Sequence, residues 1–351
     1  MRKDWMSAAH RAALAGAGIA AGAVLTIVAQ ARVITDTPPE WRIKSPRPQV
    51  EQVRVDAKLP DYRAVPGLAG KVRSIGSSGL SNLVQTWAEE FKGIYPNVEI
   101  EIEGVGSEGG VKALIEGAAD VAPMSRAMTQ AEVGQFQARF GYPPVRVPVA
   151  LDAISVYVNK YNPLDAIDLE QLEAIYAATR KRGGEPIRTW GQLGLTGAWA
   201  SRDIAVKSPD RKQGLYAMFR DLVLEGGNYR YDLQAEPVST SIVQAVGADA
   251  DAIGFASRFY ATLRTRALAV KGRGATQAVL PTPENCQNGS YPLARKLYLY
   301  VNRKPGTAVP PTVEQFLGYV CSRAGQETVV REGNLPLSAA LARDECMAPL
   351  H

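Results

Sequence analysis

Two glycine- and serine-rich turns, each between a strand-like and a helix-like segment, constrain this chain most strongly. The first, SIGSSG at residues 74–79, and the second, GVGSEGG at residues 104–110, lie close together in the sequence. The free N–H groups and positive dipole of a helix N-terminus favour an anion, and glycine lets the backbone approach it. Serine hydroxyls add further donors. The pattern predicts two helix N-termini converging on one small anion.

Strand-like and helix-like segments alternate along the chain from about residue 71. This alternation favours an α/β fold with mainly parallel sheets. Capping-box patterns mark helix starts after Thr129 and Asp168, and further helices are expected after Ser78 and after the second turn. The strands expected from apolar or alternating runs are residues 72–75, 98–102, 120–122, 145–149, 154–158 and 204–206.

Charge and histidine content exclude several classes of function. The 351 residues suffice for two domains, but a formal charge of +5 is too small to indicate nucleic-acid binding. The histidines are His10 and His351, so a Ser-His-Asp or Cys-His arrangement and a multi-histidine metal site are excluded. The second turn also fits G-x-G-x-x-G, but Asp120 comes too early for a dinucleotide site. We therefore expect no catalytic residues, no metal and no cofactor.

The N-terminal segment has the pattern of an export signal. A basic start precedes an uncharged run at residues 12–31, which closes on the small-x-small sequence Ala29-Gln30-Ala31. The alternative is a retained membrane anchor, Ala12 to Ala31, because such a run just spans a bilayer. Residues 1–31 are thus expected to be a signal peptide or anchor, and the proline-rich residues 32–70 an extended linker.

A series of short motifs then follows in a characteristic order: residues 75–78, 104–110, 120–126, 151–158, 189–194, 252–255, 291–295, 325–327 and 333–337. On these motifs, the chain from about Lys71 to Leu337 resembles the periplasmic phosphate-binding proteins of ABC transporters, within the type 2 solute-binding proteins. The resemblance implies two lobes with a ligand cleft between them, each lobe a mainly parallel sheet flanked by helices. Lobe 1 would comprise residues 71–150 plus 255–345, and lobe 2 residues 151–254.

The resemblance also implies an oxyanion site made of hydroxyl and backbone donors from both lobes. The alternative for its serines is ordinary helix N-capping, which requires no ligand. The expected ligand-binding residues are Ser77, Ser78, Gly79, Ser107, Gly109, Ser125, Asp210, Arg211 and Gly214.

The second-lobe motif departs from the family pattern. Gln213 and Leu215 stand where serine and threonine are expected, and Pro209 falls near the expected arginine. Arg211 or Lys207 could restore the positive charge, but leucine cannot replace a hydroxyl donor.

The resemblance implies a monomeric, non-enzymatic periplasmic protein that captures a small oxyanion, phosphate above all. It would serve ABC-transporter uptake or sensing, with an inner-membrane permease or sensor as its partner. The alternative is a degenerate phosphate-binding-like domain, tethered through residues 12–31, that acts as an interaction or signalling scaffold.

Three cysteines in an exported chain leave one unpaired. We expect Cys286–Cys346 to form the disulfide, with Cys321–Cys346 as the alternative.

Overall fold

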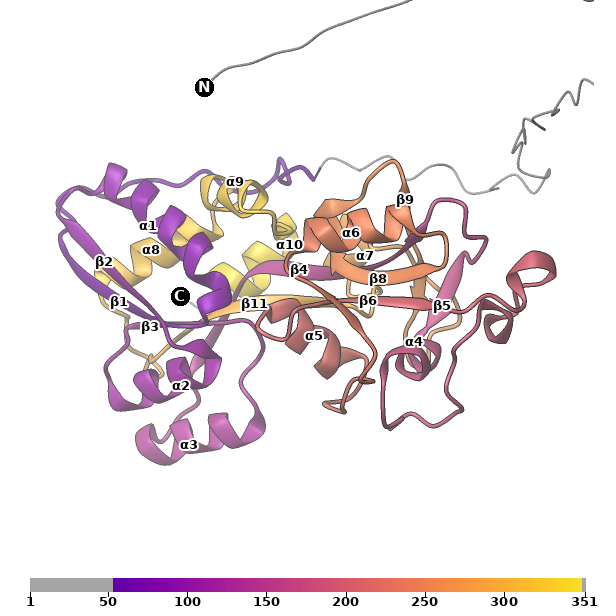
Figure 1. Cartoon of the computed structure of the whole chain (residues 1–351). Helices are drawn as coiled ribbons and strands as arrows, with labels where there is room; N and C mark the ends of the chain where they lie inside the picture. The colour runs from indigo at the N-terminus through magenta and orange to yellow at the C-terminus, as the bar shows by residue number, and fades with distance from the viewer. Residues whose placement is uncertain (1–52, 349–351) are drawn as a thin grey trace, which may run out of the picture. The chain divides into compact units, whose positions relative to one another are not determined.

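A long strand, β4 (Val145–Asn159), runs through the middle of the fold and belongs to both of its halves (Figure 1). The structure is a computed structural model that describes residues 53–348. The first part of β4 pairs with antiparallel β11 (Ala294–Val301), and the part from Ile154 pairs with antiparallel β8 (Ala252–Ser257). The prediction of two separate strands here is wrong, because β4 changes partners at Ile154 without interrupting its own backbone.

The main sheet has the order β2-β1-β3-β11-β4-β8-β6-β7, with β9 paired to β4. β1 is parallel to β2 and β3, and β6 is parallel to β7 and β8. Two mainly parallel sets, which match the prediction, therefore flank an antiparallel centre that the prediction did not include. The remaining strands are β1 (Gly70–Gly76), β2 (Val98–Gly104), β3 (Val121–Met124), β5 (Ala166–Asp168), β6 (Ala205–Pro209), β7 (Gln234–Glu236), β9 (Thr265–Ala267) and β10 (Ala269–Lys271).

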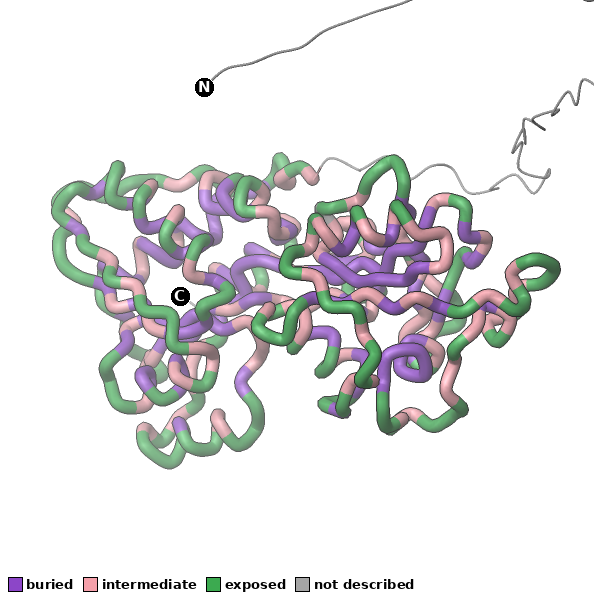
Figure 2. The backbone as a smooth tube through the Cα atoms, viewed as in Figure 1, coloured by how far each residue is buried: buried purple, intermediate pink, exposed green. Residues whose placement is uncertain are grey.

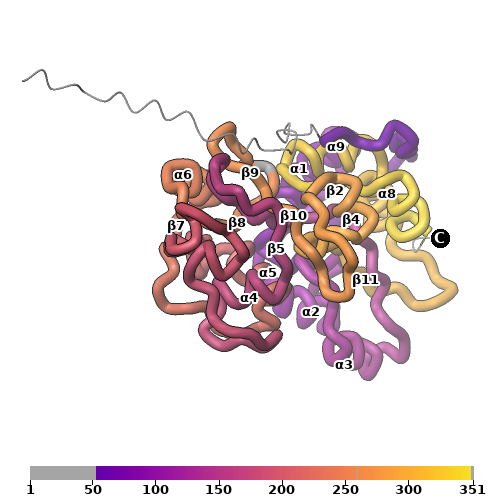
Figure 3. Tube along the Cα trace, turned by 90° about the vertical axis from the view of Figure 1, so that its right-hand side faces the viewer, coloured from indigo at the N-terminus to yellow at the C-terminus, as the bar shows by residue number. Residues whose placement is uncertain are grey.

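Helices cover both faces of each half. In the first half, α1, α8 and α9 lie on one face and α2 and α3 on the other; in the second, α6 lies opposite α4 and α5 (Figures 1 and 3). The α-helices are α1 (Ser81–Ile94), α2 (Gly106–Glu116), α3 (Gln130–Phe140), α4 (Leu169–Tyr176), α5 (Gly214–Leu222), α6 (Ser239–Ala248), α7 (Pro283–Gln287), α8 (Pro311–Cys321), α9 (Arg323–Arg331) and α10 (Ala339–Leu341). Shorter turns are η1 (Ser78–Leu80), η2 (Trp190–Leu193), η3 (Gly197–Trp199), η4 (Arg258–Tyr260) and the π-helix η5 (Ala342–Met347).

Buried residues follow the central strands and the inward faces of the helices (Figure 2). One small cluster lies between α2, α3 and the sheet and includes Leu114, Met124 and Phe136. Another, which includes Tyr157 and Ile242, lies beneath α6. Burial of these apolar faces fixes each helix on the sheet.

Both predicted capping boxes are confirmed. At α3, Thr129 Oγ1 accepts a hydrogen bond from Glu132 N at 3.2 Å, and Thr129 N donates to Glu132 Oε2 at 2.7 Å. At α4, Asp168 and Gln171 exchange the corresponding bonds at 2.8 and 3.1 Å. These helix starts are encoded locally, by residues three positions apart.

The segment before β1 carries no helix or strand over residues 53–69. It is nevertheless attached to the first half, because Leu59 is buried and Arg323 N donates to Pro60 O at 2.9 Å. The predicted signal peptide or anchor (residues 1–31) and the start of the predicted linker lie outside the described residues. Within residues 53–348, no helix has the length and apolar character needed to cross a membrane.

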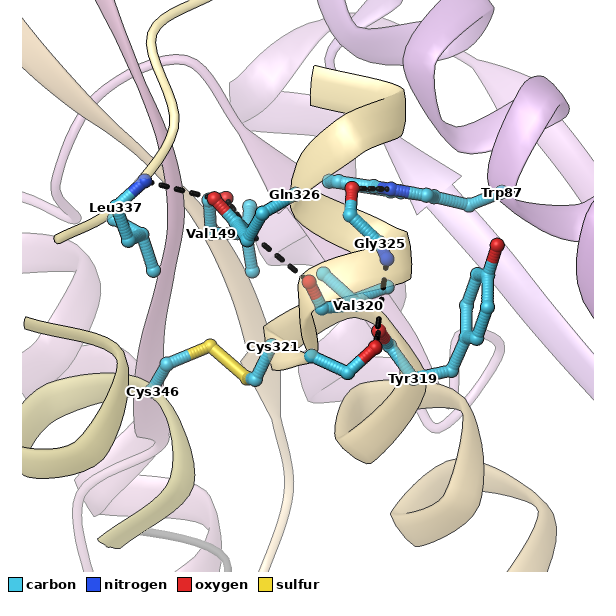
Figure 4. The surroundings of a disulfide bond; sticks show 10 residues. Trp87, Val149, Tyr319, Val320, Cys321, Gly325, Gln326, Leu337 and Cys346 are labelled. Atoms are coloured by element: carbon cyan, nitrogen blue, oxygen red, sulfur yellow. Dashed lines mark hydrogen bonds between the residues drawn. A yellow bond between two sulfur atoms is a disulfide. The ribbon is translucent and has the colours of Figure 1, made fainter. Parts of the chain in front are cut away.

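The disulfide joins Cys321 to Cys346 (Figure 4). Among the described residues, Cys286 is a buried free thiol. The preferred pairing of Cys286 with Cys346 is wrong and the alternative holds. Cys321 is the last residue of α8, and η5 brings Cys346 beside it, with both residues fully buried. The bond therefore ties the C-terminal segment to α8.

Near the disulfide, one buried glutamine connects α9 to the centre of the sheet (Figure 4). Val149 is the extra residue of a β-bulge, where the pairing of β4 with β11 shifts register. The side chain of Gln326 donates to Val149 O and to Val320 O, both at 2.9 Å, and accepts from Leu337 N at 2.7 Å. The side chain of Gln326 thus supplies a hydrogen-bond donor to the carbonyl group of Val149 at the bulge.

Removing the disulfide is expected to destabilise the protein. It closes a segment with a sequence separation of 25 residues. Replacing both Cys321 and Cys346 by alanine should lower the free energy of unfolding by about 3 kcal/mol, measured by urea denaturation. The control is Cys286→Ala, which leaves the disulfide intact and should cost less. Alkylation of denatured, unreduced wild type should label Cys286 alone; labelling of Cys321 or Cys346 would contradict the assignment.

Candidate functional site

The two glycine- and serine-rich turns lie side by side at one edge of the sheet. β1 and β2 pair in parallel from Gly70 opposite Val98 to Gly76 opposite Gly104, so both strands end together. Val105 N donates to Gly76 O at 2.9 Å and joins the two turns. The carboxyl ends of parallel strands in open α/β sheets are where ligands bind.

Two glycines allow this close approach. A Cβ on Gly76 would lie 2.3 Å from Pro123 O, and one on Gly110 would lie 2.8 Å from Gly76 Cα. These neighbours are backbone atoms, which cannot rotate away. Glycine at both positions therefore lets α2 pack directly against the ends of β1 and β3.

A matched pair of alanine substitutions tests this packing. Gly110→Ala should lower the free energy of unfolding by about 1–3 kcal/mol, because the added methyl group overlaps backbone. Gly134→Ala, inside α3 with no atom within 4 Å of the added methyl, should raise it by about 0.5–1 kcal/mol. Thermal and urea unfolding measure both. Equal effects of the two substitutions would contradict a steric requirement at Gly110.

The structure brings Ser107 and Ser125 together. Their hydroxyl oxygens are 3.3 Å apart, and Ser125 N donates to Ser107 Oγ, also at 3.3 Å. Both residues are half-buried. Ser125 directly follows β3, so a third strand end contributes to the same place. Two hydroxyl groups that remain partly accessible form the centre of the candidate site.

Ser78 lies against the second turn from the opposite side. A Cβ on Gly104 would be 3.2 Å from Ser78 Cβ. Ser78 and Gly79 are exposed at the start of η1, whereas Ser77 is buried and its N donates to Pro123 O at 2.7 Å. The first helical segment is thus a short 3-10 turn that leads into α1, rather than an α-helix starting directly after Ser78.

The site serines of the first lobe make no side-chain capping hydrogen bond to a helix. Val105 is the N-cap of α2, so Ser107 lies within its first turn, and Gly109 follows in the same helix. Ser77 is the N-cap of η1 but its side chain makes no capping hydrogen bond. The first backbone N–H groups of an α-helix have no partner within the helix. The start of α2 therefore offers N–H donors beside the Ser107 hydroxyl.

In the second half, the predicted residues Asp210, Arg211 and Gly214 form the β6–α5 loop. The carboxylate of Asp210 accepts from Lys212 N at 2.9 Å and so stabilises the loop itself. Gly214 is the exposed first residue of α5. Arg211 is exposed and makes no hydrogen bond or ion pair with any residue that the structure describes.

The glutamine that replaces the expected serine has a structural task in this loop. Gln213 Nε2 donates to Pro237 O at 2.6 Å and to Glu236 O at 3.2 Å, which ties the loop to the end of β7. Both amide protons are used by these bonds. Leu215 is half-buried against the core. Neither side chain offers a donor in place of the missing hydroxyls.

Sequence reasoning missed the ion pair between Arg126 and Glu132. The guanidinium donates from Nη1 to Glu132 Oε2 at 2.7 Å and from Nη2 to Glu132 Oε1 at 2.8 Å. These bonds, against the opposing effect of burial, lower the pKa of Glu132 to about 2. The sequence offered one indication of this ion pair: Arg126 directly follows Ser125 and lies six residues before Glu132, the glutamate of the α3 capping box.

Glu132 should make the stability of the protein depend on acid pH. Because its pKa is depressed on folding, its contribution is complete above about pH 4.5 and is lost as the pH falls toward about 2. Glu132→Gln keeps the capping-box geometry but does not titrate. Its free energy of unfolding should fall less steeply over this range in urea denaturation. The exposed Glu116 serves as control, and Glu116→Gln should follow the wild-type curve; a Glu132→Gln curve parallel to wild type would contradict the assignment.

The other reactive side chains of the described residues are dispersed carboxylates and one buried free cysteine. No group of three or more His, Cys, Asp or Glu side chains within residues 53–348 could hold a metal ion. Burial raises the pKa of the Cys286 thiol to about 12, so this cysteine is not a thiolate at neutral pH.

Comparison with known proteins identifies the family. The PBP superfamily domain matches residues 63–324. The chain is 39% identical over 289 residues to the phosphate-binding protein PstS of Pseudomonas aeruginosa, covering 82% of this chain and 90% of that protein. An ABC-type phosphate transport receptor from Vibrio cholerae superposes with a TM-score of 0.64 at 21% identity, covering 76% of this chain and 99% of the receptor. A structure from Clostridium perfringens with bound phosphate gives 0.53 at 26% identity, covering 77% and 100% of the respective chains. The two-lobed fold and the sequence similarity together show that this chain belongs to the PBP superfamily, among the relatives of PstS.

Proposed function

We propose that this protein captures phosphate outside the cytoplasm and delivers it to an ABC permease. The observation that carries the proposal is the meeting of Ser107, Ser125 and the start of α2 at the carboxyl ends of β1, β2 and β3, in a relative of PstS. The hydroxyl groups of Ser107 and Ser125 and the first N–H groups of α2 can donate hydrogen bonds to an oxyanion, and the exposed carboxylate of Glu108 also lies in this first turn.

The energetics of anion binding explain why so many donors are needed. A phosphate dianion that leaves water loses strong hydration, and fixed donors must replace it. The first lobe supplies hydroxyl groups from Ser78, Ser107 and Ser125 together with backbone N–H groups. The second lobe supplies the N-terminus of α5 at Gly214 and the guanidinium of Arg211, which has no partner in the part of the chain that the structure describes. On this proposal the ligand lies between the lobes, which divide near residues 151 and 254, and both lobes contact it.

A second candidate function rests on the second-lobe loop. Because the donors of Gln213 are used within the protein, this lobe has fewer free donors than the family pattern provides. The alternative is therefore a related fold that no longer retains solute and serves as an interaction or signalling scaffold in the cell envelope. Under either function the protein acts by binding, as the name of its PstS relative indicates.

Calorimetric titration with phosphate separates these two functions. For the proposed function, purified full-length protein should bind phosphate with micromolar or tighter affinity, and arsenate should compete. Sulfate and molybdate complete the series as test anions. A folded sample that gives no heat with any of these oxyanions would favour the scaffold.

The serine cluster gives a second test. Ser107→Ala should weaken phosphate binding by about 1–3 kcal/mol, because the hydroxyl donates to a charged and desolvated ligand. The matched control is Ser201→Ala, which alters an exposed serine on a loop of the second half. Unchanged affinity for Ser107→Ala would remove this hydroxyl from the site, and equal losses for both variants would point to a non-specific effect.

A further inference from the structure

The hydrogen bonds of the Arg126 guanidinium leave one edge of the group, with the Nε–H and one Nη2–H, without a partner among the described residues. Glu132 takes one N–H from Nη1 and one from Nη2, and Ala127 O accepts the remaining Nη1 proton at 3.1 Å. The Nε–H and the second N–H of Nη2 have no partner among the described residues. These two groups point in the same direction and form a planar fork that matches two oxygens of a carboxylate or phosphate.

Other arginines of this protein use the same fork internally. Arg73 donates from Nε and Nη2 to Asp120 at 3.1 and 2.7 Å, and Arg343 donates from these atoms to Asp344 at 2.7 and 3.0 Å. Arg230 binds Asp232 in the same manner. Arg126 instead binds Glu132 through Nη1 and Nη2. This ion pair fixes the guanidinium and leaves the Nε/Nη2 fork unused.

Arg126 lies next to the candidate site, in the loop between β3 and α3. It directly follows Ser125, whose hydroxyl contacts Ser107. Its side chain is 33% exposed and that of Glu132 is 14% exposed, so the guanidinium remains accessible while its partner is largely covered. Glu132, Glu108 on α2 and Asp221 on α5 stabilise its charge and raise its pKa. Carboxylates of both lobes therefore stabilise the positive charge of Arg126.

We propose that Arg126 is an additional oxyanion-binding residue, which contacts two phosphate oxygens through Nε–H and Nη2–H while Glu132 positions it. The family pattern has an arginine near Pro209 in the second-lobe loop, and this chain lacks it. The contact through Arg126 would supply such a guanidinium fork from the first lobe. The inference rests on the proposed phosphate-binding function. It assigns Glu132 a positioning role, because its carboxylate fixes the guanidinium and does not itself approach the anion.

Phosphate titration of full-length wild type, Arg126→Lys and Arg73→Lys tests the fork. Lysine keeps the positive charge but loses the planar pair of donors. Arg126→Lys should therefore weaken phosphate binding by about tenfold or more, whereas Arg73→Lys, which removes an internally used fork, should bind as wild type does. Wild-type affinity in a folded Arg126→Lys variant would overturn the inference.

A measurement on the wild-type protein keeps the test independent of variant folding. In ¹⁵N-resolved NMR, addition of phosphate should shift the Nε–H resonance of Arg126 and leave that of Arg73 in place. An unmoved Arg126 resonance at phosphate saturation would overturn the contact. If wild type binds no phosphate, the proposed function itself fails; if wild type binds and only these Arg126 results are negative, the inference alone fails.

Discussion

The continuous backbone pairing of β4 is the interaction on which the rest of this structure depends. Buried N–H and C=O groups must find partners, and β4 satisfies its own by pairing with β11 and then with β8. One strand thereby joins the two lobes through the sheet itself. The bulge at Val149 would break this arrangement, but Gln326 supplies the missing hydrogen bond from α9. The disulfide at Cys321 lies beside the same region and fixes the C-terminal segment there.

The candidate site follows from how the strand ends meet. Parallel pairing of β1 with β2 and β3 places their carboxyl ends together, and glycines at positions 76 and 110 remove the side chains that would keep α2 away. This edge presents the hydroxyl groups of Ser107 and Ser125 and the first N–H groups of α2, next to the carboxylate of Glu108. Such donors are suited to an anion because they replace its hydration without moving.

Two arginines near the candidate site differ in their ion pairing. Arg126 is neutralised by Glu132 and keeps its Nε–H unpaired among the described residues. Arg211 lies on an exposed loop and has no ion-pair partner within residues 53–348. A paired guanidinium has a fixed direction, which an exposed arginine lacks. If the proposed function holds, the first lobe therefore contributes pre-organised donors and the second lobe more adaptable ones.

The sequence by itself determined the features that depend on residues close together in the chain. The α/β alternation, the capping boxes at Thr129 and Asp168 and the two glycine-rich turns are local, because strand period, helix caps and turn residues act over a few positions. Only the tertiary structure decided that β4 is continuous and that Cys321 pairs with Cys346. It also decided that Glu132 binds the Nη1 and Nη2 groups of Arg126. Each of these depends on which distant segments pack against one another, and no local propensity encodes that.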